Sequence, residues 1–286
     1  MQNNPLKLIE CPRDAMQGWP KFIPTKKKIQ YINKLLKIGF DTIDFGSFVS
    51  PMAIPQMADT KEVIGNLEFC NTRTKLLAII ANLRGANEAC NFEQISFLGF
   101  PFSISETFQQ RNTNSSVDES LKRVEEIQQL CLKNKKELVV YISMGFGNPY
   151  GDEYNEEIVL RRTKQINDLG IKIISVADTV GLASPQEVHS TVKNLIHAFP
   201  DTEIGVHLHS SPLQRDEKTE ASLSAGCTRF DSAIKGIGGC PMAGNDLVGN
   251  MDTETLINFF EKKNFYLDLD KNALQNCIKI AEEIFI

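Results

Sequence analysis

Two histidines are separated by a single residue in the segment VHLH, at residues 206–209, which follows a run of apolar residues. Side chains alternate between the two faces of a strand, so His207 and His209 are expected to point the same way. Two imidazoles on one face can share a metal ion, whereas a lone strand histidine is usually a satisfied core residue. His189 and His197 lie in a segment with helical spacing and are expected on the surface. The sequence therefore predicts a metal site at the end of this strand.

An arginine and an aspartate follow the first apolar run directly, in the segment ECPRDAMQ. Arg13, Asp14 and Gln17 would serve a ligand there, or Arg13 and Asp14 would form a surface ion pair. Asp44 lies between Ile43 and Phe45, and if these two face helices the carboxylate faces the interior. A buried carboxylate needs a partner. A ligand and a salt bridge to Arg13 are compatible explanations.

Asp14, His207 and His209 form a mixed set of oxygen and nitrogen donors, with Asn245 or Asn250 as a fourth candidate. Such a set suits Mg²⁺ or Mn²⁺. Zinc is less favoured, because no second cysteine accompanies Cys240. Cys240 lies within the glycine-rich segment GIGGCPMAGNDLVGN, at residues 236–250, which is either a flexible connector or a mobile loop that closes over a site and brings a thiol to a reaction.

Other polar residues have competing interpretations. Asp178 and Thr179 follow the sixth apolar run and would contact substrate or cap the next helix. The run from Lys26 to Lys28 opens an expected helix and is interpreted as its solvent-facing side.

Short apolar runs alternate with helical patterns along the chain. The best helical pattern, at residues 25–39, places Ile29, Ile32 and Leu35 on one face and ends at Gly39. No glycine fingerprint of a doubly wound dinucleotide fold follows the first run, so a (β/α)8 TIM barrel is predicted. From about Asp252 we expect a C-terminal helical extension, and residues 1–286 are interpreted as a single domain. The expected strands are 6–10, 41–45, 75–80, 94–99, 137–143, 171–177, 203–209 and 227–234.

The bulk properties exclude several classes of protein. The net charge of −5 gives no general attraction to nucleic acid. No stretch reaches the ~18 apolar residues of a membrane span, and the N-terminus lacks the pattern of an export signal. The seven cysteines are widely spaced without a CxxC pair, which indicates a reducing, cytoplasmic compartment.

Taken in order, these motifs resemble the 3-hydroxy-3-methylglutaryl-CoA lyase family of metal-dependent TIM barrels. The resemblance rests on PRDAMQ (12–17), SFVSP (47–51), SETFQQRNTNSS (105–116), ADTVG (177–181), VHLH (206–209) and GIGGCP (236–241). It covers most of the chain, and GGCP after the histidine pair is its most specific part. Related condensing synthases share the Arg-Asp pair of PRDAMQ and the histidine pair of VHLH, but not GGCP.

The resemblance implies divalent-metal-dependent cleavage of 3-hydroxy-3-methylglutaryl-CoA to acetyl-CoA and acetoacetate. The implied metal ligands are Asp14, His207, His209 and Asn250. Arg13 would stabilise an enolate, Cys240 would act in proton transfer, and Asp14 or His207 would be the base. Residues implied to bind substrate or support the site are Gln17, Asp44, Ser47, Ser50, Asp178, Thr179 and Glu254. Candidates for the phosphates of coenzyme A are Lys21, Arg111, Asn112 and Asn114.

Three departures from the family pattern leave a second hypothesis open. Asp44 replaces a usual glutamate, Met52 stands where lysine is common, and the segment from Cys240 to Asn250 is one residue longer. A related aldolase or Claisen-type synthase, acting on another hydroxyacyl-CoA or a 2-oxo acid, is therefore the alternative. A sensor that only binds a CoA ester has no need of both ligands and an acid. The sequence leaves a homodimer open.

Overall fold

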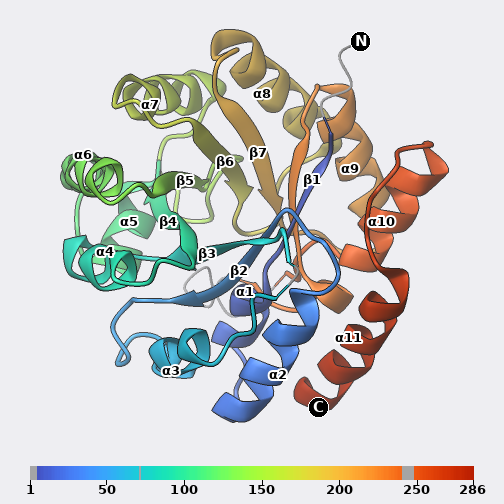
Figure 1. Cartoon of the computed structure of the whole chain (residues 1–286). Helices are drawn as coiled ribbons and strands as arrows, with labels where there is room; N and C mark the ends of the chain where they lie inside the picture. The colour runs from blue at the N-terminus through green and yellow to red at the C-terminus, as the bar shows by residue number, and fades with distance from the viewer. Residues whose placement is uncertain (1–4, 71, 240–247) are drawn as a thin grey trace.

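A closed barrel of parallel strands forms the centre of the molecule in the computed structural model (Figure 1), which describes residues 5–70, 72–239 and 248–286. Strand β1 pairs with β2 on one side and with β8 on the other, which closes the sheet. The strands are β1 (Lys7–Glu10), β2 (Thr42–Ser47), β3 (Lys75–Ile79), β4 (Ile95–Ser103), β5 (Glu137–Ser143), β6 (Ile173–Asp178), β7 (Glu203–Leu208) and β8 (Arg229–Ser232). The predicted TIM barrel is confirmed.

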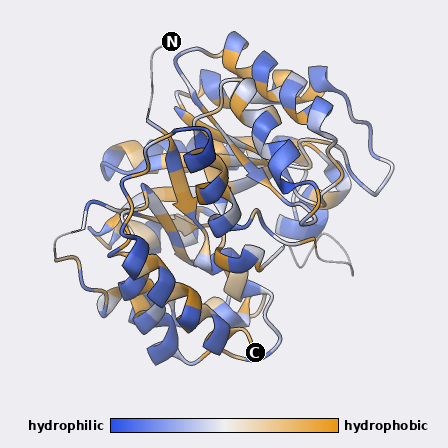
Figure 2. Cartoon of the chain, turned by 90° about the vertical axis from the view of Figure 1, so that its right-hand side faces the viewer, coloured by the Kyte–Doolittle hydropathy of each residue, from blue (hydrophilic) through white to orange (hydrophobic). Residues whose placement is uncertain are grey.

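Helices surround the barrel and connect its strands (Figure 1). They are α1 (Pro12–Gln17), α2 (Thr25–Leu35), α3 (Thr60–Gly65), α4 (Leu83–Cys90), α5 (Glu106–Thr113), α6 (Val117–Lys133), α7 (Glu156–Asp168), α8 (Pro185–Ala198), α9 (Arg215–Ser224), α10 (Thr253–Lys262) and α11 (Lys271–Ile284). In Figure 2 the strands are largely hydrophobic and the helices turn hydrophilic faces outward, as expected for parallel strands that are covered by helices. None of the described helices is long and apolar enough to span a membrane.

Each expected strand is present, but β4 is longer than the sequence pattern predicted. It continues through Pro101 to Ser103, and Pro101 pairs in register with Tyr141 of β5. Proline usually indicates the end of a strand because it lacks an N–H donor. Here Phe100 and Phe102 are fully buried beyond the expected end at residue 99, so the alternation of buried apolar side chains extends β4.

The C-terminal extension packs beside the barrel. Helix α11 lies against α2, as the neighbouring red and blue helices of Figure 1 show. The Asp270 N–H donates to the carbonyl of Ile38 at 2.8 Å, so the start of α11 is fixed to the chain that follows α2.

The solvent-facing interpretation of the lysine run is wrong for Lys28. Its side chain is buried, and Nζ lies 2.8 Å from Asp59 Oδ1 and also donates to the Gln56 carbonyl. Burial lowers the pKa of Lys28, and Asp59 opposes that shift. Lys28 therefore holds the chain around Gln56 and Asp59, which follows β2, against α2.

Ser184 is the N-cap of helix α8, so the alternative of a capping role for Asp178 or Thr179 is also wrong. Ser184 accepts from the Glu187 N–H, and the Glu187 carboxylate accepts from the Ser184 N–H in return, which is a capping box. Asp178 and Thr179 therefore do not cap α8. Asp178 instead accepts from Lys218, and Thr179 accepts from the Met144 N–H.

Candidate active site

Helix α1 presents Arg13 and Asp14 at the carboxyl end of β1. Pro12 occupies its first turn, where the missing N–H costs no hydrogen bond. The turn begins directly after Glu10, so both charged side chains lie at the barrel mouth and are buried there. Active sites of TIM barrels lie at this end of the strands.

Arg13 lies between two carboxylates. Its Nε and Nη2 contact Asp44 Oδ2 at 3.0 and 2.5 Å, and its Nη1 contacts Asp14 Oδ1 at 2.9 Å. Asp44 therefore forms the predicted salt bridge to Arg13. Burial raises the pKa of Asp44 to about 6, and Arg13 limits the rise, so this carboxylate is ionised at neutral pH.

Asp14 is held by three neighbours. Besides Arg13, Gln17 Nε2 donates to its Oδ1 at 2.8 Å, and Asn250 Nδ2 donates to its Oδ2 at 2.7 Å. Burial would raise the pKa of Asp14, but Arg13 and the two histidines outweigh it and bring the pKa to about 2. The carboxylate is a fixed anion.

The two histidines are oriented through their Nδ1 atoms. His207 Nδ1 lies 3.0 Å from Asp231 Oδ2, and His209 Nδ1 lies 3.1 Å from the Val248 carbonyl. Burial and the neighbouring His207 lower the pKa of His209 to about 4, so its ring is neutral at pH 7. Burial also lowers the pKa of His207, but Asp231 outweighs it and the net direction is upward. These contacts leave Nε2 of each ring as the nitrogen available to a ligand.

Ligand atoms of Asp14, His207 and His209 all lie within 4.8 Å of one another. One carboxylate and two imidazoles with supported orientations are a suitable donor set for a divalent cation. A second group, Cys11 with His207 and Asp231, is equally compact. It is a poor metal site, because burial and the surrounding carboxylates raise the pKa of Cys11 well above its usual value and keep the thiol protonated.

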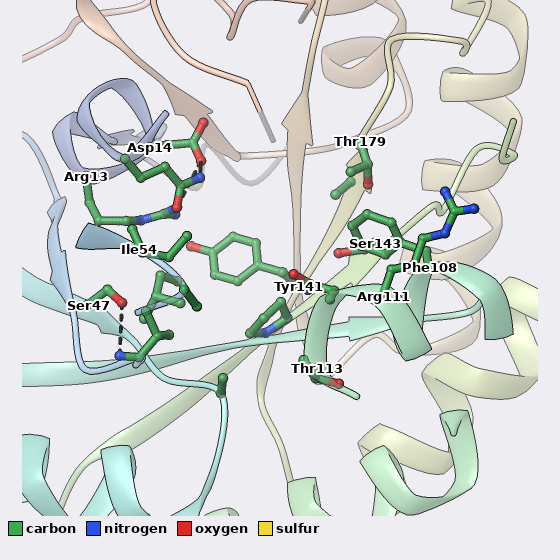
Figure 3. A pocket seen from close by; sticks show the side chains of 18 of the residues that line it. Arg13, Asp14, Ser47, Ile54, Phe108, Arg111, Thr113, Tyr141, Ser143 and Thr179 are labelled. Atoms are coloured by element: carbon green, nitrogen blue, oxygen red, sulfur yellow. Dashed lines mark hydrogen bonds and ion pairs between the residues drawn. The ribbon is translucent and has the colours of Figure 1, made fainter. Parts of the chain in front are cut away.

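A pocket of about 550 Å³ opens beside this cluster. In Figure 3, Arg13 and Asp14 lie on one side, Arg111 and Thr113 on the other, and Tyr141 lies between them. This volume is in the range of small-molecule sites. The sequence-predicted residues among its lining are Arg13, Asp14, Gln17, Ser47, Ser50, Arg111, Asn112, Asn114, Thr179, His207 and His209.

Several predicted residues lie elsewhere. Asp178 does not line the pocket; its Oδ2 lies 2.8 Å from the buried Lys218 Nζ. Glu254 accepts from the Lys235 N–H at 3.0 Å and does not reach the pocket lining either. Asp44 lies behind Arg13, and Lys21 is not part of the lining. Asn250 meets Asp14 as described above, whereas Cys240 and Asn245 lie outside the described residues.

The structure adds residues that sequence reasoning missed. Asp231 orients His207, Tyr141 packs edge-on against the same ring at 5.7 Å, and Arg123 lines the pocket. Lys218 donates to the carbonyl of His209 at 3.1 Å as well as to Asp178. Only Asp231 carried a usable signal, since alternation along β8 places it on the face opposite Phe230.

Comparison with known proteins gives consistent results. The hydroxymethylglutaryl-CoA lyase of Bacillus subtilis (strain 168) is 31% identical, over 95% of this chain and 90% of the relative. The mitochondrial hydroxymethylglutaryl-CoA lyase of Bos taurus is 32% identical, over 88% of this chain and 77% of its own. A solved HMG-CoA lyase from Acinetobacter baumannii, in complex with coenzyme A and 3-methylmalate, has a TM-score of 0.90 and 30% identity, covering 98% of this chain and 91% of that one.

The family model with the description HMGL-like matches residues 7–281. That span begins in β1, includes both the Arg-Asp helix and the strand with the two histidines, and ends within α11. The chain belongs to the HMGL-like family.

Proposed function

We propose that this chain is a carbon–carbon lyase that cleaves 3-hydroxy-3-methylglutaryl-CoA to acetyl-CoA and acetoacetate. The observation that carries the proposal is the cluster of Asp14, His207 and His209 beside a pocket whose far rim holds Arg111. The relatives named for this activity support the substrate. We treat residues 1–286 as one catalytic domain, in a cytoplasmic compartment in keeping with the free thiols of all six described cysteines.

Asp14, His207 and His209 would hold the divalent cation, with Asn250 as the fourth protein ligand. Asn250 is preferred to Asn245 because its side chain already contacts Asp14. Mg²⁺ or Mn²⁺ suits a set of oxygen and imidazole donors without a thiolate. When bound, the cation would supply Lewis acidity and a template for the hydroxyl and carboxylate oxygens of the substrate.

Cleavage needs a base, an enolate stabiliser and an acid. A base removes the proton of the C3 hydroxyl, the C2–C3 bond breaks, and its electron pair moves toward the thioester oxygen. Arg13 lines the pocket with a permanently charged guanidinium that Asp44 and Asp14 hold in place, which suits the developing enolate. The candidates for the base are Asp14 and His207. The pKa of about 2 makes Asp14 a weak base, and the only His207 nitrogen not taken by Asp231 is the one proposed to bind the cation. Cys240 would return a proton to the enolate carbon.

The far rim of the pocket is proposed to bind coenzyme A. Arg111 and Arg123 supply positive charge there, and Asn112 and Asn114 supply amides. A similar solved structure contains coenzyme A. Residues Ser47, Ser50 and Thr179 line the remaining wall and are proposed to contact the acyl part of the substrate.

The test is formation of acetoacetate from 3-hydroxy-3-methylglutaryl-CoA by protein stripped of metal, with and without added Mg²⁺ or Mn²⁺. We expect activity to require the cation and to fall by at least about a hundredfold in Cys240→Ala, as for loss of a general acid. Cys70→Ala is the matched control, because that thiol is free and exposed. Full activity of Cys240→Ala would contradict the assignment of the acid.

A second candidate function keeps the metal site and changes the substrate. Asp44 motivates it, since its carboxylate is taken up by Arg13 and lies behind the pocket lining. Met52 motivates it too, because it is 94% exposed and adds no charge to the rim. A panel of acyl-CoA esters and 2-oxo acids decides between the two. A clear preference for another member of the panel would replace the lyase assignment. The homodimer remains a prediction for the same protein preparation, tested by its mass in solution.

A further inference from the structure

An arginine lies inside the barrel, below the candidate metal centre. Arg229 on β8 is almost fully buried. It faces Gly205 of β7, where an added Cβ would lie 2.9 Å from Arg229 Cδ and 3.2 Å from Ser175 Oγ. The glycine therefore leaves the space that the arginine side chain fills, and Arg229 and Ser175 share one compartment of the interior.

Only part of this guanidinium has a protein partner. Arg229 Nη1 lies 3.1 Å from Glu203 Oε1, and the second oxygen of Glu203 is taken by Lys7. The Nε and Nη2 atoms are buried and have no partner among the described residues. Buried donors of a charged group are costly to leave without a hydrogen bond.

Three more buried polar atoms in the barrel interior lack a partner among the described residues. They are Asp231 Oδ1, Tyr141 Oη and Ser175 Oγ. Burial would lower the pKa of Arg229, but the negative charges around it, Asp231 first among them, outweigh burial and raise it. Arg229 and Asp231 therefore interact although they form no direct ion pair. Asp231 also acts on Tyr141, which places the phenol in the same electrostatic environment.

We propose that ordered water fills the interior between Arg229, Ser175, Tyr141 and Asp231, and that through it Arg229 positions Asp231 and hence the metal ligand His207. Water is the ligand that fits, because it donates and accepts at once. A water molecule can accept hydrogen bonds from the guanidinium N–H groups of Arg229 and donate one to Asp231 Oδ1. A halide could accept from the arginine and the hydroxyls, but it would face the Asp231 carboxylate.

The consequence for the site is geometric. Asp231 Oδ2 contacts His207 Nδ1 at 3.0 Å, so an anchored Oδ1 would keep the whole carboxylate, and with it the imidazole, in one orientation. Arg229 is therefore a positioning residue and not a catalytic one. This second part of the inference rests on the proposed metal-dependent function; the first part does not.

The first experiment is a high-resolution crystal structure of the metal-free protein, with a second crystal soaked in bromide. We expect water oxygens within hydrogen-bond distance of Arg229 Nε or Nη2 and of Asp231 Oδ1, and no anomalous bromide peak there. A bromide peak, or a direct contact between Arg229 and Asp231, would overturn the proposal.

The second experiment measures Mn²⁺ affinity by titration, without substrate. Arg229→Met removes charge and donors at similar length, and Gly205→Ala keeps every charge but pushes against Arg229 Cδ. We expect both to weaken Mn²⁺ binding about threefold to tenfold, less than the 10–100-fold typical of a residue that contacts the ligand itself. Lys7→Met is the matched control, since it removes a cation whose ion pair is with Glu203, and the Mn²⁺ affinity of this variant should equal that of the wild type.

The outcomes separate the inference from the proposed function. If the wild type binds Mn²⁺ and Gly205→Ala, checked to be folded by circular dichroism, binds it equally well, the positioning role of Arg229 is wrong. If the wild type binds no Mn²⁺, the proposed metal site fails, while the crystal structures still decide whether water joins Arg229 to Asp231.

Discussion

Replacement of Asp231 by asparagine tests the best-defined support of the candidate metal site. Asp231 Oδ2 lies 3.0 Å from His207 Nδ1, and the carboxylate is almost fully buried. Asparagine keeps the shape and an acceptor oxygen but removes the negative charge. In Asp231→Asn we expect weaker metal binding, because without the negative charge beside it the imidazole loses basicity.

The size of the effect follows from the contact. Loss of a residue that orients a metal-bound histidine typically costs 10–100-fold in metal affinity, or about 1.4–2.7 kcal/mol. The loss should depend on pH. Burial alone would lower the pKa of His207, but the effect of Asp231 is larger and opposite, so the pKa lies above its usual value. In the wild type a proton therefore competes with the metal for His207 at acid pH. Without Asp231 that competition weakens, and the difference between variant and wild type should be smaller at pH 6 than at pH 8.

Titration with Mn²⁺ at both pH values, read by the loss of its free electron paramagnetic resonance signal, measures the effect. His209 adds no pH dependence there, since its pKa is about 4. The control variant is Asp168→Asn, because that side chain is exposed and forms its ion pair with Lys164. Unchanged affinity at pH 8, or a loss that grows toward pH 6, would refute the assigned role of Asp231.

Three further predictions concern buried charges. Lys218→Met should cost about 3–5 kcal/mol in urea unfolding at pH 7, because it strands the buried carboxylate of Asp178. Adding Asp178→Asn to it should recover most of that loss, and an undiminished double-variant loss would contradict the pairing. Burial raises the pKa of Glu10 to about 8, so the folded wild type should lose stability as pH rises from about 4.5 to 8, by up to about 1.4 kcal/mol per pH unit. Glu10→Gln should flatten that dependence in thermal unfolding. Arg13→Lys should lower kcat more than it raises KM in the acetoacetate assay, because lysine cannot span Asp44 and Asp14.

The order of the strands was accessible from the sequence because each one is a short apolar run between helical patterns. The burial of Lys28 was not. Nothing local distinguishes it from Lys26 and Lys27, and its partners Gln56 and Asp59 lie about thirty residues further along the chain. The same limit applies to Asp178. Its position at the end of β6 was predicted correctly, but its ion-pair partner, Lys218, lies on α9, 40 residues further along the chain.

The barrel interior shows where local reasoning ends. Strand alternation placed Asp44 inward, and the same rule applied to the weak apolar run of β8 places Arg229 and Asp231 inward, with Phe230 between them facing outward. Which partners they meet depends on register. Gly205 pairs with Arg229 and Val206 with Phe230, so the next step brings His207 beside Asp231 and leaves Glu203 near Arg229. That register is fixed only when all the strands close around one core. Residue types can therefore predict that charge lies inside the barrel, but only the closed sheet decides that Asp231 serves a histidine while Arg229 lies beneath it.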